Sequence, residues 1–476
     1  MKSFIRTFTL IAGSAILLNQ SIWSDDSKLP DLGDSESAVL SQHDEELLGS
    51  QILMQFRRSG ALVKDPIIKY FVKSNLYELA QYSEMNPSDL HPIIIDSPEL
   101  NALAAPGGII GIHVGLFSYA HDIHEYSSVI AHELAHLSQR HFARRLDHDR
   151  RTRLTQSLAW VASSLVFAMG GDEAGLAGLA ATTALNERLT LGYSRAQERE
   201  ADRIGLETLK QAGYDPEGAM RLFLRLQDQQ KYEAELEVYR STHPLTTERI
   251  SDLRVRVQEP EEQQYPSSDD YQLVRARTVH SFFDSPSEAK AHAQNLSDDS
   301  IYTKYLQALA LQANDEFDAG VKIMEEVVKT LPGSIIAASC FADYLIEVEQ
   351  EERAIEEIDD VLANTPGSTP LRLMKVRAFR ALHKYEQAAK LLAKVARQNP
   401  EDTELWFDLA EIQGLAKNTL EVHRARAEYY GLVGNFADAI KHLQLAKRIN
   451  DGGSELIDAR IDQKILEFRR LAELNS

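Results

Sequence analysis

The sequence predicts a mainly α-helical chain, in which an α+β part with a small sheet is followed by an all-α solenoid of repeated helix pairs. Three observations lead to this prediction. Apolar residues recur at helical spacing along much of the chain, short apolar runs separated by turn residues occupy 91–117, and a 34-residue period runs through the C-terminal half. We therefore expect a leader at 1–24, a first folded part at 25–262 and a repeat part at 263–476.

The N-terminus is predicted to be a secretory signal peptide. Lys2 and Arg6 precede an apolar run at 8–18, and the small residue Ser24 stands before an acidic pair. This order of basic, apolar and small residues is typical of signal peptides. A transmembrane anchor is the alternative, but spanning a bilayer takes about 20 apolar residues, and this run is shorter. The periplasm of a bacterium is the expected destination.

Charge and cysteine content restrict the classes of function. Lys and Arg number 51 against 72 Asp and Glu, which gives a net charge of −21, and a surface this negative repels a phosphate backbone. Nucleic acid is therefore not expected as a partner. The only cysteine is Cys340, for which a buried apolar position is expected. An intrachain disulfide is excluded, and a metal ion must be held by His, Asp or Glu.

The first folded part is predicted to combine helices with a few strands. Helical spacing covers about 44–84, and the strand and turn residues of 91–117 suggest two or three short strands that end near Val114. Helical spacing returns over about 119–146 and again over 194–212. Charged and turn-forming residues at 259–270 then mark the most probable boundary with the second part.

The repeat is visible at two sets of positions. Prolines at 34-residue spacing close successive units, and small residues stand twelve positions before each proline; these are Pro332, Pro366 and Pro400, and Gly320, Ala354 and Ala388. This pattern is typical of tetratricopeptide repeats, and a generic helical bundle is the alternative. A further unit around 427–446 lies out of phase, and one additional helix around 406–415 would absorb the shift.

The strongest chemical signal is His132-Glu133-Leu134-Ala135-His136. On a helix, His132 and His136 lie on one face, so both imidazoles can reach one metal ion. Glu133, beside them, is positioned to accept a proton from metal-bound water. Patterns this short also occur by chance on solvated helix faces. Because hydrolytic zinc sites take three protein ligands, a third ligand elsewhere in the chain would decide between the two interpretations.

The third ligand is expected from the segment Glu198-Arg-Glu-Ala-Asp202. Glu198 and Asp202 are four residues apart on a predicted helix, so one carboxylate can bind the metal while the other orients a ligating histidine. Glu200 must point away from Glu198 on such a helix. Taken alone, this segment would be an ordinary charged helix face.

The order of these motifs resembles a known peptidase family. The chain contains, in order, Asn101 to Gly108 (NALAAPGG), the His132 to His136 motif, Ser194-Arg195 before Glu198 and Asp202, and His243-Pro244 with Arg249. Over residues 90–250 it is similar to the gluzincin family that contains the CAAX prenyl protease and the heat-shock protease HtpX. The resemblance implies a zincin-type metalloendopeptidase that binds one zinc ion per chain through His132, His136 and Glu198.

The resemblance also implies roles for four further residues. Glu133 matches the general base, and Asp202 matches a residue that supports a ligand from behind. His243 and Arg249 match a pair at the active site, where they would steady the oxyanion of the tetrahedral intermediate. For His243 two other interpretations stay open: a fourth metal ligand that closes the site and keeps the enzyme latent, or a histidine that faces solvent.

Substrate binding is expected at Ile109, Ile110, Gly111 and Ile112, on the strand before the metal helix. In zinc peptidases of this type, an extended peptide docks on the edge strand by main-chain hydrogen bonds. Unfolded or stalled chains are therefore the expected substrates. Stacked helix pairs form a groove for protein segments, so the repeat part is expected to select substrates or to dock onto an assembly machine.

Periplasmic members of this family that carry C-terminal tetratricopeptide repeats imply a more specific function. They suggest an endopeptidase with chaperone-like activity that promotes the assembly of outer-membrane β-barrel proteins and degrades misassembled or stalled ones. Its partners would be unfolded outer-membrane proteins and, through the repeat groove, the outer-membrane barrel assembly machinery. The alternative is a mainly non-proteolytic scaffold with a closed metal site.

Two features are left without a catalytic role. The apolar, glycine-rich segment 158–184 is either a buried helical hairpin or a loop that covers the cleft or contacts a membrane surface. The remaining histidines near the motif are interpreted as ordinary core or surface residues; these are His113, His121, His124 and His141.

Overall fold

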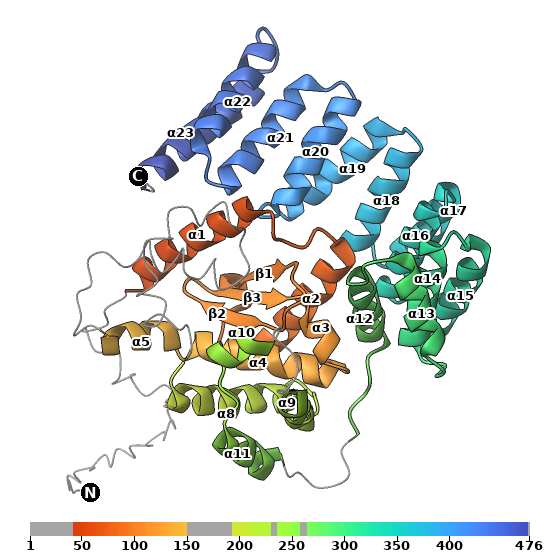
Figure 1. The fold of residues 1–476 in the computed structure, drawn as a ribbon. Coiled ribbons are helices and arrows are strands. Elements are labelled where there is room, and N and C mark those ends of the chain that lie inside the picture. The colour runs from red at the N-terminus through yellow and green to blue at the C-terminus, as the bar shows by residue number, and fades with distance from the viewer. Residues whose placement is uncertain (1–40, 150–192, 230–235, 258–263, 475–476) are drawn as a thin grey trace, which may run out of the picture. The chain divides into compact units, whose positions relative to one another are not determined.

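The computed structural model describes residues 41–149, 193–229, 236–257 and 264–474. The predicted signal peptide at 1–24 and the apolar segment at 158–184 lie outside these residues. In the described part of the chain, no helix combines the length and the apolar character needed to cross a lipid bilayer. The predicted fold class is confirmed, because the structure is mainly α-helical, with a small sheet and a series of helical repeats (Figure 1).

The N-terminal helical stretch consists of two helices, α1 (Gln42–Ser59) and α2 (Pro66–Ala80). The helical spacing that continues through 44–84 is interrupted by Gly60, whose φ of 74° closes α1 in a left-handed turn. The carboxylate of Asp65 then caps α2, which begins with a proline. Local capping residues thus divide a stretch that hydrophobic spacing alone treats as continuous.

The sheet has three strands, β1 (His91–Ile95), β2 (Ala102–Ala105) and β3 (Ile109–His113). Their order is β1-β3-β2, with β3 parallel to β1 and antiparallel to β2. The last strand in the chain is therefore the central strand of the sheet. Gly107 and Gly108, with φ near 74°, form the turn that returns the chain from β2 to β3.

Helices cover both faces of the sheet (Figure 1). Side chains of α1 pack on one face, where Ile52 and Phe56 meet Ile93 and Ile109. The other face carries alternate residues of β3, such as Ile110, and these join the core around the helix that bears the predicted metal motif. Alternation of side chains along each strand accounts for the two separate clusters.

Among the described residues, the first folded part has seven further helices. They are α3 (Leu116–Tyr119), α4 (Ile123–Ser138), α5 (His141–Asp149), α8 (Arg195–Gln211), α9 (Glu217–Gln229), α10 (Glu237–Thr242) and α11 (Thr247–Val257). The predicted helix over 119–146 is divided after Ser138, because Arg140 has a φ of 49° and turns the chain before α5 begins. The predicted helix over 194–212 agrees closely with α8.

The repeat part consists of α12 (Asp269–Ser281), α13 (Pro286–Asn295), α14 (Ile301–Ala313), α15 (Phe317–Thr330), α16 (Ile335–Glu347), α17 (Glu351–Leu362), α18 (Thr369–Ala381), α19 (Tyr385–Gln398), α20 (Thr403–Leu415), α21 (Thr419–Leu432), α22 (Phe436–Ile449) and α23 (Glu455–Leu474). The predicted contact residues Gly320, Ala354 and Ala388 are buried. Pro332, Pro366 and Pro400 each follow the second helix of a pair, as the 34-residue period predicts.

Left-handed turn residues give an independent measure of the repeat. Asp315, Glu349, His383 and Lys417 all have φ between 58° and 61° and recur every 34 residues, each at the turn between two helices. The next such residue is Gly434, with φ of 70°, only 17 residues after Lys417. The additional helix predicted around 406–415 is therefore present as α20, and it shifts the later repeats by half a period.

The core of the first folded part continues into the repeat part through α12. The ring of Tyr271 lies 5.6 to 5.8 Å, between centroids, from the rings of Phe71, Phe117 and Tyr126, and its hydroxyl donates to the carbonyl of Ala120 at 2.6 Å. The same hydrophobic cluster extends through α14 to α17. Later repeats have clusters of their own.

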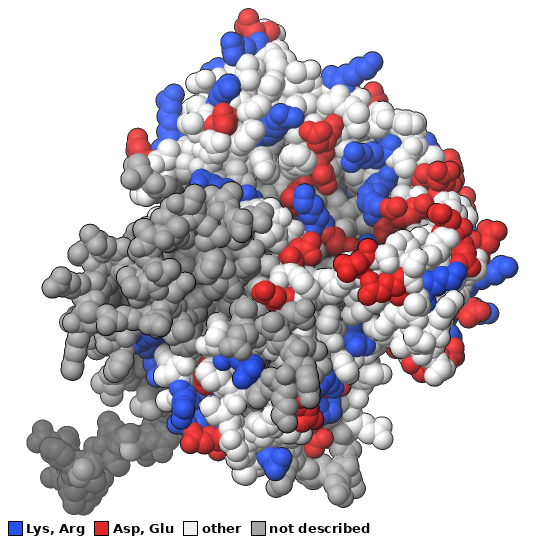
Figure 2. All heavy atoms as spheres, in the orientation of Figure 1, with Lys and Arg blue, Asp and Glu red and all other residues white. Residues whose placement is uncertain are grey.

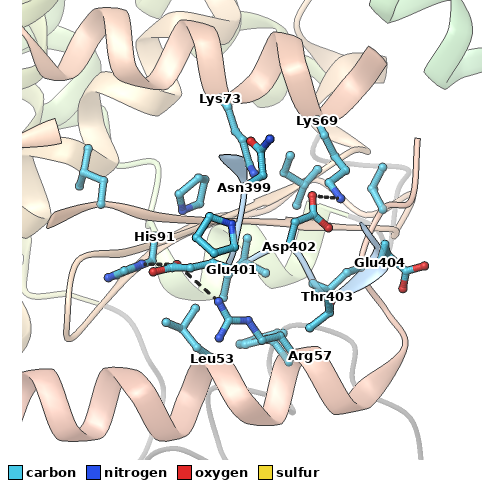
Figure 3. Close-up of a pocket in the computed structure, with 18 of the residues that line it drawn as sticks. Leu53, Arg57, Lys69, Lys73, His91, Asn399, Glu401, Asp402, Thr403 and Glu404 are labelled. Carbon is cyan, nitrogen blue, oxygen red and sulfur yellow. Dashed lines mark hydrogen bonds and ion pairs between the residues drawn. The ribbon is translucent and has the colours of Figure 1, made fainter. Parts of the chain in front are cut away.

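A second contact joins the turn before α20 to the N-terminal helices (Figure 3). The ammonium of Lys69 lies 2.5 Å from the carboxylate of Asp402, and Glu401 lies 3.5 Å from Arg57 and 3.2 Å from His91. These residues line a cavity of about 320 Å³. Opposite charges thus hold the repeat helices against α1, α2 and β1.

The described surface carries charges of both signs. On the face in Figure 2, Lys and Arg side chains stand among Asp and Glu side chains over the repeat helices. Mixed charge of this kind favours solubility and gives no extended positive area on the described part of that face.

Candidate metal centre

Helix α4 carries the first half of the site. Its N-terminus is capped by the carboxylate of Asp122, which accepts from two backbone N–H groups of the first turn. His132, Glu133 and His136 follow on one side of the helix, and all three are buried. Because α4 packs on the sheet through its other residues, these side chains face α8 and not solvent.

Helix α8 brings Glu198 and Asp202 against α4. Ser194 and Gln197 form a capping box that starts α8. Gly205 permits the close approach of the two helices, because a Cβ at this position would lie 3.1 Å from the backbone nitrogen of His132. A side chain at this position would crowd the neighbouring backbone, so glycine lets the imidazoles of α4 and the carboxylates of α8 lie close together.

His243 enters the site from the loop after α10. Its backbone N–H donates to the carbonyl of Tyr239 at 2.7 Å, and the two rings lie 5.1 Å apart between centroids. Only 1% of His243 is exposed. The interpretation of this residue as a solvent-facing histidine is therefore wrong for this conformation of the chain.

Four side chains converge on one point. His132 Nε2 lies 3.0 Å from His136 Nε2 and 3.3 Å from His243 Nδ1. The carboxylate of Glu198 lies 3.3 to 3.5 Å from ring nitrogens of all three histidines. One donor atom from each of the four residues lies within 4.8 Å of the others. Three imidazoles and a carboxylate form a donor set typical of zinc.

The charges and the unpaired oxygens of the cluster fit a divalent cation. With neutral imidazoles, Glu133, Glu198 and Asp202 carry three negative charges, and Arg249 is the buried cation that contacts two of them. The oxygens of Glu133 are buried and accept no hydrogen bond among the described residues, whereas those of Glu198 face Arg249 and ring nitrogens of the three histidines. Buried carboxylates without hydrogen bonds are costly, so a bound dication would balance this cluster in charge and in coordination.

The electrostatics separate the roles of two carboxylates. Burial raises the pKa of Glu133, which suits a base that must take up a proton. Burial alone would also raise the pKa of Glu198, but His243 and hydrogen bonds from His132 and His136 hold it well below its usual range. Glu198 thus stays ionised as a ligand, whereas Glu133 is the more basic of the two.

Arg249 lies behind the ligands instead of facing a substrate. Its Nε and one terminal nitrogen each donate to Asp202 at 2.7 Å. The other terminal nitrogen pairs with Glu198 at 2.7 Å and donates to the carbonyl of Pro244 at 3.0 Å. Asp202 in turn lies 3.1 Å from His132 Nδ1. The donors of Arg249 are occupied, so the geometry favours a role in holding Asp202 and Glu198 over the expected contact with an oxyanion.

The expected substrate strand needs a correction. Ile109, Ile110, Gly111 and Ile112 belong to β3, which pairs with β1 on one side and with β2 on the other. Its backbone groups are therefore unavailable to a peptide. Among the strands that the structure describes, the one beside α4 with a free edge is β2. The carbonyl of Asn101 accepts from the N–H of His113, so by alternation along an antiparallel pair the backbone groups of Ala102 and Ala104 point away from β3, to the free edge.

Tyr193 lies between this edge and the metal ligands. No role was assigned to this residue from the sequence. Its hydroxyl donates to the carbonyl of Ala104 at 3.0 Å, and its ring stacks on that of His136 at 3.8 Å between centroids. Burial raises the pKa of the Tyr193 hydroxyl, which therefore keeps its proton as a donor. The available signal was its position directly before Ser194 and Arg195.

His141 also contacts a ligand, although it was interpreted as an ordinary histidine. Its Nδ1 lies 2.9 Å from Nδ1 of His136, and its Nε2 lies 3.1 Å from Glu200. Glu200 points away from Glu198, as its position on the helix predicts, and thereby reaches His141. The other histidines named with His141 have no contact with the four donors among the described residues; these are His113, His121 and His124.

Comparison with known proteins agrees with this fold and site. Residues 70–257 match the model of peptidase family M48, and residues 369–412 match that of a tetratricopeptide repeat. Residues 70–257 are thus similar to peptidase family M48, and the chain is a metalloprotease that carries tetratricopeptide repeats.

Its relatives include proteins that it matches over nearly the full length. It is 28% identical to the β-barrel assembly-enhancing protease of Escherichia coli (strain K12), covering 98% of this chain and 96% of the relative. It is 29% identical to the putative β-barrel assembly-enhancing protease of Vibrio cholerae, covering 100% of both chains. The mitochondrial metalloendopeptidase OMA1 of Schizosaccharomyces pombe is 32% identical over 34% of this chain and 44% of the relative.

Proposed function

We propose that this chain is a periplasmic zinc-dependent endopeptidase with chaperone-like activity, which promotes the assembly of outer-membrane β-barrel proteins and degrades misassembled or stalled ones. The names of its full-length relatives support the link to β-barrel assembly. The proposed organisation is a signal peptide at 1–24, a peptidase part at 25–262 and a repeat part at 263–476. The repeat groove is proposed to hold substrates or the outer-membrane assembly machinery.

The observation that carries the proposal is the convergence of four buried donors beside Glu133. His132, His136 and Glu198 would hold the zinc ion, and zinc when bound supplies a Lewis acid that polarises the scissile carbonyl. Glu133, next to His132 on the same helix, would take a proton from the attacking water and return it to the leaving amine. Asp202 would keep the Nε2 of His132 directed at the site.

His243 is proposed to keep the enzyme latent. Its Nδ1 lies 3.3 Å from His132 Nε2 and from Glu198, and its Nε2 lies 3.4 Å from Glu133. A fourth protein donor leaves no open position at a tetrahedral zinc site, and this histidine also stands in front of the proposed base. Movement of the loop at His243 and Pro244 would open the site for a substrate. The alternative function, a mainly non-proteolytic scaffold, is favoured by the same closed arrangement.

The proposal is tested by comparing the mature chain with its His243→Ala variant. We expect both to contain about one zinc ion per chain and the variant to cleave casein at least about tenfold faster, because the closing donor is gone. A chelator should abolish this cleavage. His121→Ala, which changes an exposed histidine outside the cluster, is the matched control. Cleavage by the unaltered chain that is lost in His243→Ala would instead give His243 a catalytic role, and an absence of cleavage in both zinc-loaded chains would favour the scaffold.

Substrate is proposed to bind in extended form along the free edge of β2. The carbonyl of Ala104 would accept from a substrate N–H, but it now accepts from the hydroxyl of Tyr193. Tyr193 must therefore release this carbonyl when a peptide docks. The ring of Tyr193, stacked on His136, can stay in place.

Tyr193→Phe should lower the KM for a peptide substrate by about 2- to 12-fold. The change removes a competing hydrogen bond, for which a net contribution of about 0.5 to 1.5 kcal/mol is typical, and it keeps the stacked ring. Steady-state kinetics in the His243→Ala chain would measure the effect, with Tyr82→Phe at an exposed tyrosine as the control. An unchanged KM would argue against β2 as the docking edge.

A further inference from the structure

We propose that His141 is a positioning residue, which orients the metal ligand His136 and is itself held by Glu200. The inference rests on the proposed function in one respect, namely that His136 binds zinc through Nε2. It assigns a role to a histidine that lacks metal-ligand spacing and to a glutamate that faces away from the site.

The contacts form a continuous chain behind His136. The Nε2 of His136 faces the other donors, and its Nδ1 lies 2.9 Å from the Nδ1 of His141. The Nε2 of His141 lies 3.1 Å from Glu200, which also lies 3.1 Å from Arg144. His141 is fully buried, and its backbone carbonyl accepts from Gln197 at 3.0 Å. His141 is thus held by a hydrogen bond to its main chain and by contacts to both nitrogens of its ring.

The direction of these hydrogen bonds follows if His136 is to bind a metal ion through an unprotonated Nε2. If Nε2 of His136 is to bind a metal, its proton must be on Nδ1, which then donates to the Nδ1 of His141. His141 consequently carries its proton on Nε2 and donates to the carboxylate of Glu200. Every donor has an acceptor with both rings neutral. His132 is oriented in the same way, but directly, by Asp202 at 3.1 Å.

The turn after α4 brings His141 close to His136. Helix α4 ends at Ser138, and Arg140 adopts a φ of 49°, a left-handed conformation that is unfavourable for residues other than glycine. This turn brings His141 back beneath the end of α4, only five residues after His136.

Simple packing does not explain the position of His141. His113, on β3, is also fully buried, yet neither of its ring nitrogens has a hydrogen-bond partner. A histidine that only fills space can therefore be buried in this protein without specific partners. Both nitrogens of His141 are paired, and one of the partners is a ligand.

The test is the zinc affinity of the mature full-length chain, measured by competition with a chromogenic chelator. His141→Leu should weaken zinc binding by about 10- to 100-fold, the usual effect of removing the partner of a ligating histidine. His141→Asn should restore most of the affinity, because its amide oxygen can replace Nδ1 as the acceptor. Glu200→Gln should cause a smaller loss. The absorption spectrum of bound Co²⁺ should change in His141→Leu and recover in His141→Asn.

His113→Leu is the matched control, since it replaces an equally buried histidine with no contact to the donors. It should bind zinc as the unaltered chain does, and the melting temperature of each metal-free variant would register a purely structural effect. Zinc affinity in His141→Leu equal to that of the unaltered chain would overturn the proposal, as would a loss that His141→Asn does not restore. The two proposals can fail separately. Weakened zinc binding in His141→Leu would support the positioning role even if the His243→Ala chain did not cleave casein, a result that would contradict the proposed function.

Discussion

Replacing Glu133 by Gln in the His243→Ala chain is expected to lower casein cleavage by about 10²- to 10⁴-fold, the range typical of a lost general base. Glu133 is fully buried beside the donors, and its carboxylate accepts no hydrogen bond. Glutamine has nearly the same shape, but its amide cannot take up a proton from water. Packing should therefore be preserved while proton transfer is lost.

Initial rates on labelled casein, together with zinc content, measure this effect. Zinc should stay at about one ion per chain, because Glu133 is not among the four donors that converge. Glu46→Gln on the exposed side of α1 is the control for the loss of one negative charge. A Glu133→Gln chain that retains full activity would show that another group accepts the proton.

Arg249→Met is expected to lower the free energy of unfolding of the metal-free chain by about 3 to 5 kcal/mol. Arg249 is only 1% exposed, and it is the buried cation that contacts both Asp202 and Glu198. Methionine can replace the aliphatic stem but not the guanidinium. Breaking a buried ion pair by removing one partner leaves an uncompensated charge, which has a cost of this size.

Urea unfolding followed by circular dichroism would measure the loss. Arg254→Met, at an exposed position on the same helix, should change stability by less than about 0.5 kcal/mol. Added zinc should restore part of the stability of Arg249→Met, since a dication can balance the two carboxylates. If Arg249→Met lowered the free energy of unfolding no more than Arg254→Met, the ion pairs of Arg249 with Asp202 and Glu198 would not be the buried, stabilising contacts assumed here.

The parts of the site that depend on helix periodicity could be predicted from the sequence. Spacing of four residues places His132 beside His136, and the same spacing relates Glu198 to Asp202. The direction in which Glu200 points also follows from the helix. These predictions need only local geometry, because a helix fixes the relative positions of residues one turn apart.

The remaining parts depend on contacts between segments far apart in the chain. The order of three short strands is not encoded in any one of them, so β3 could not be recognised as the central strand. Arg249 is part of a motif that the sequence shows, but whether its side chain faces a substrate or the carboxylates depends on how α11 packs against α8. His141 reaches His136 only through the left-handed conformation of Arg140, which no glycine marks in the sequence.

The position of Tyr271 has a consequence for how this protein folds and how it can be divided. A chain cut at 262 would lose a ring that packs on Phe71, Phe117 and Tyr126 in the peptidase core. The catalytic part and the first repeats, which share that core, should therefore unfold in one cooperative step. The last repeats, with cores of their own, can open in local fluctuations without exposing the metal ligands.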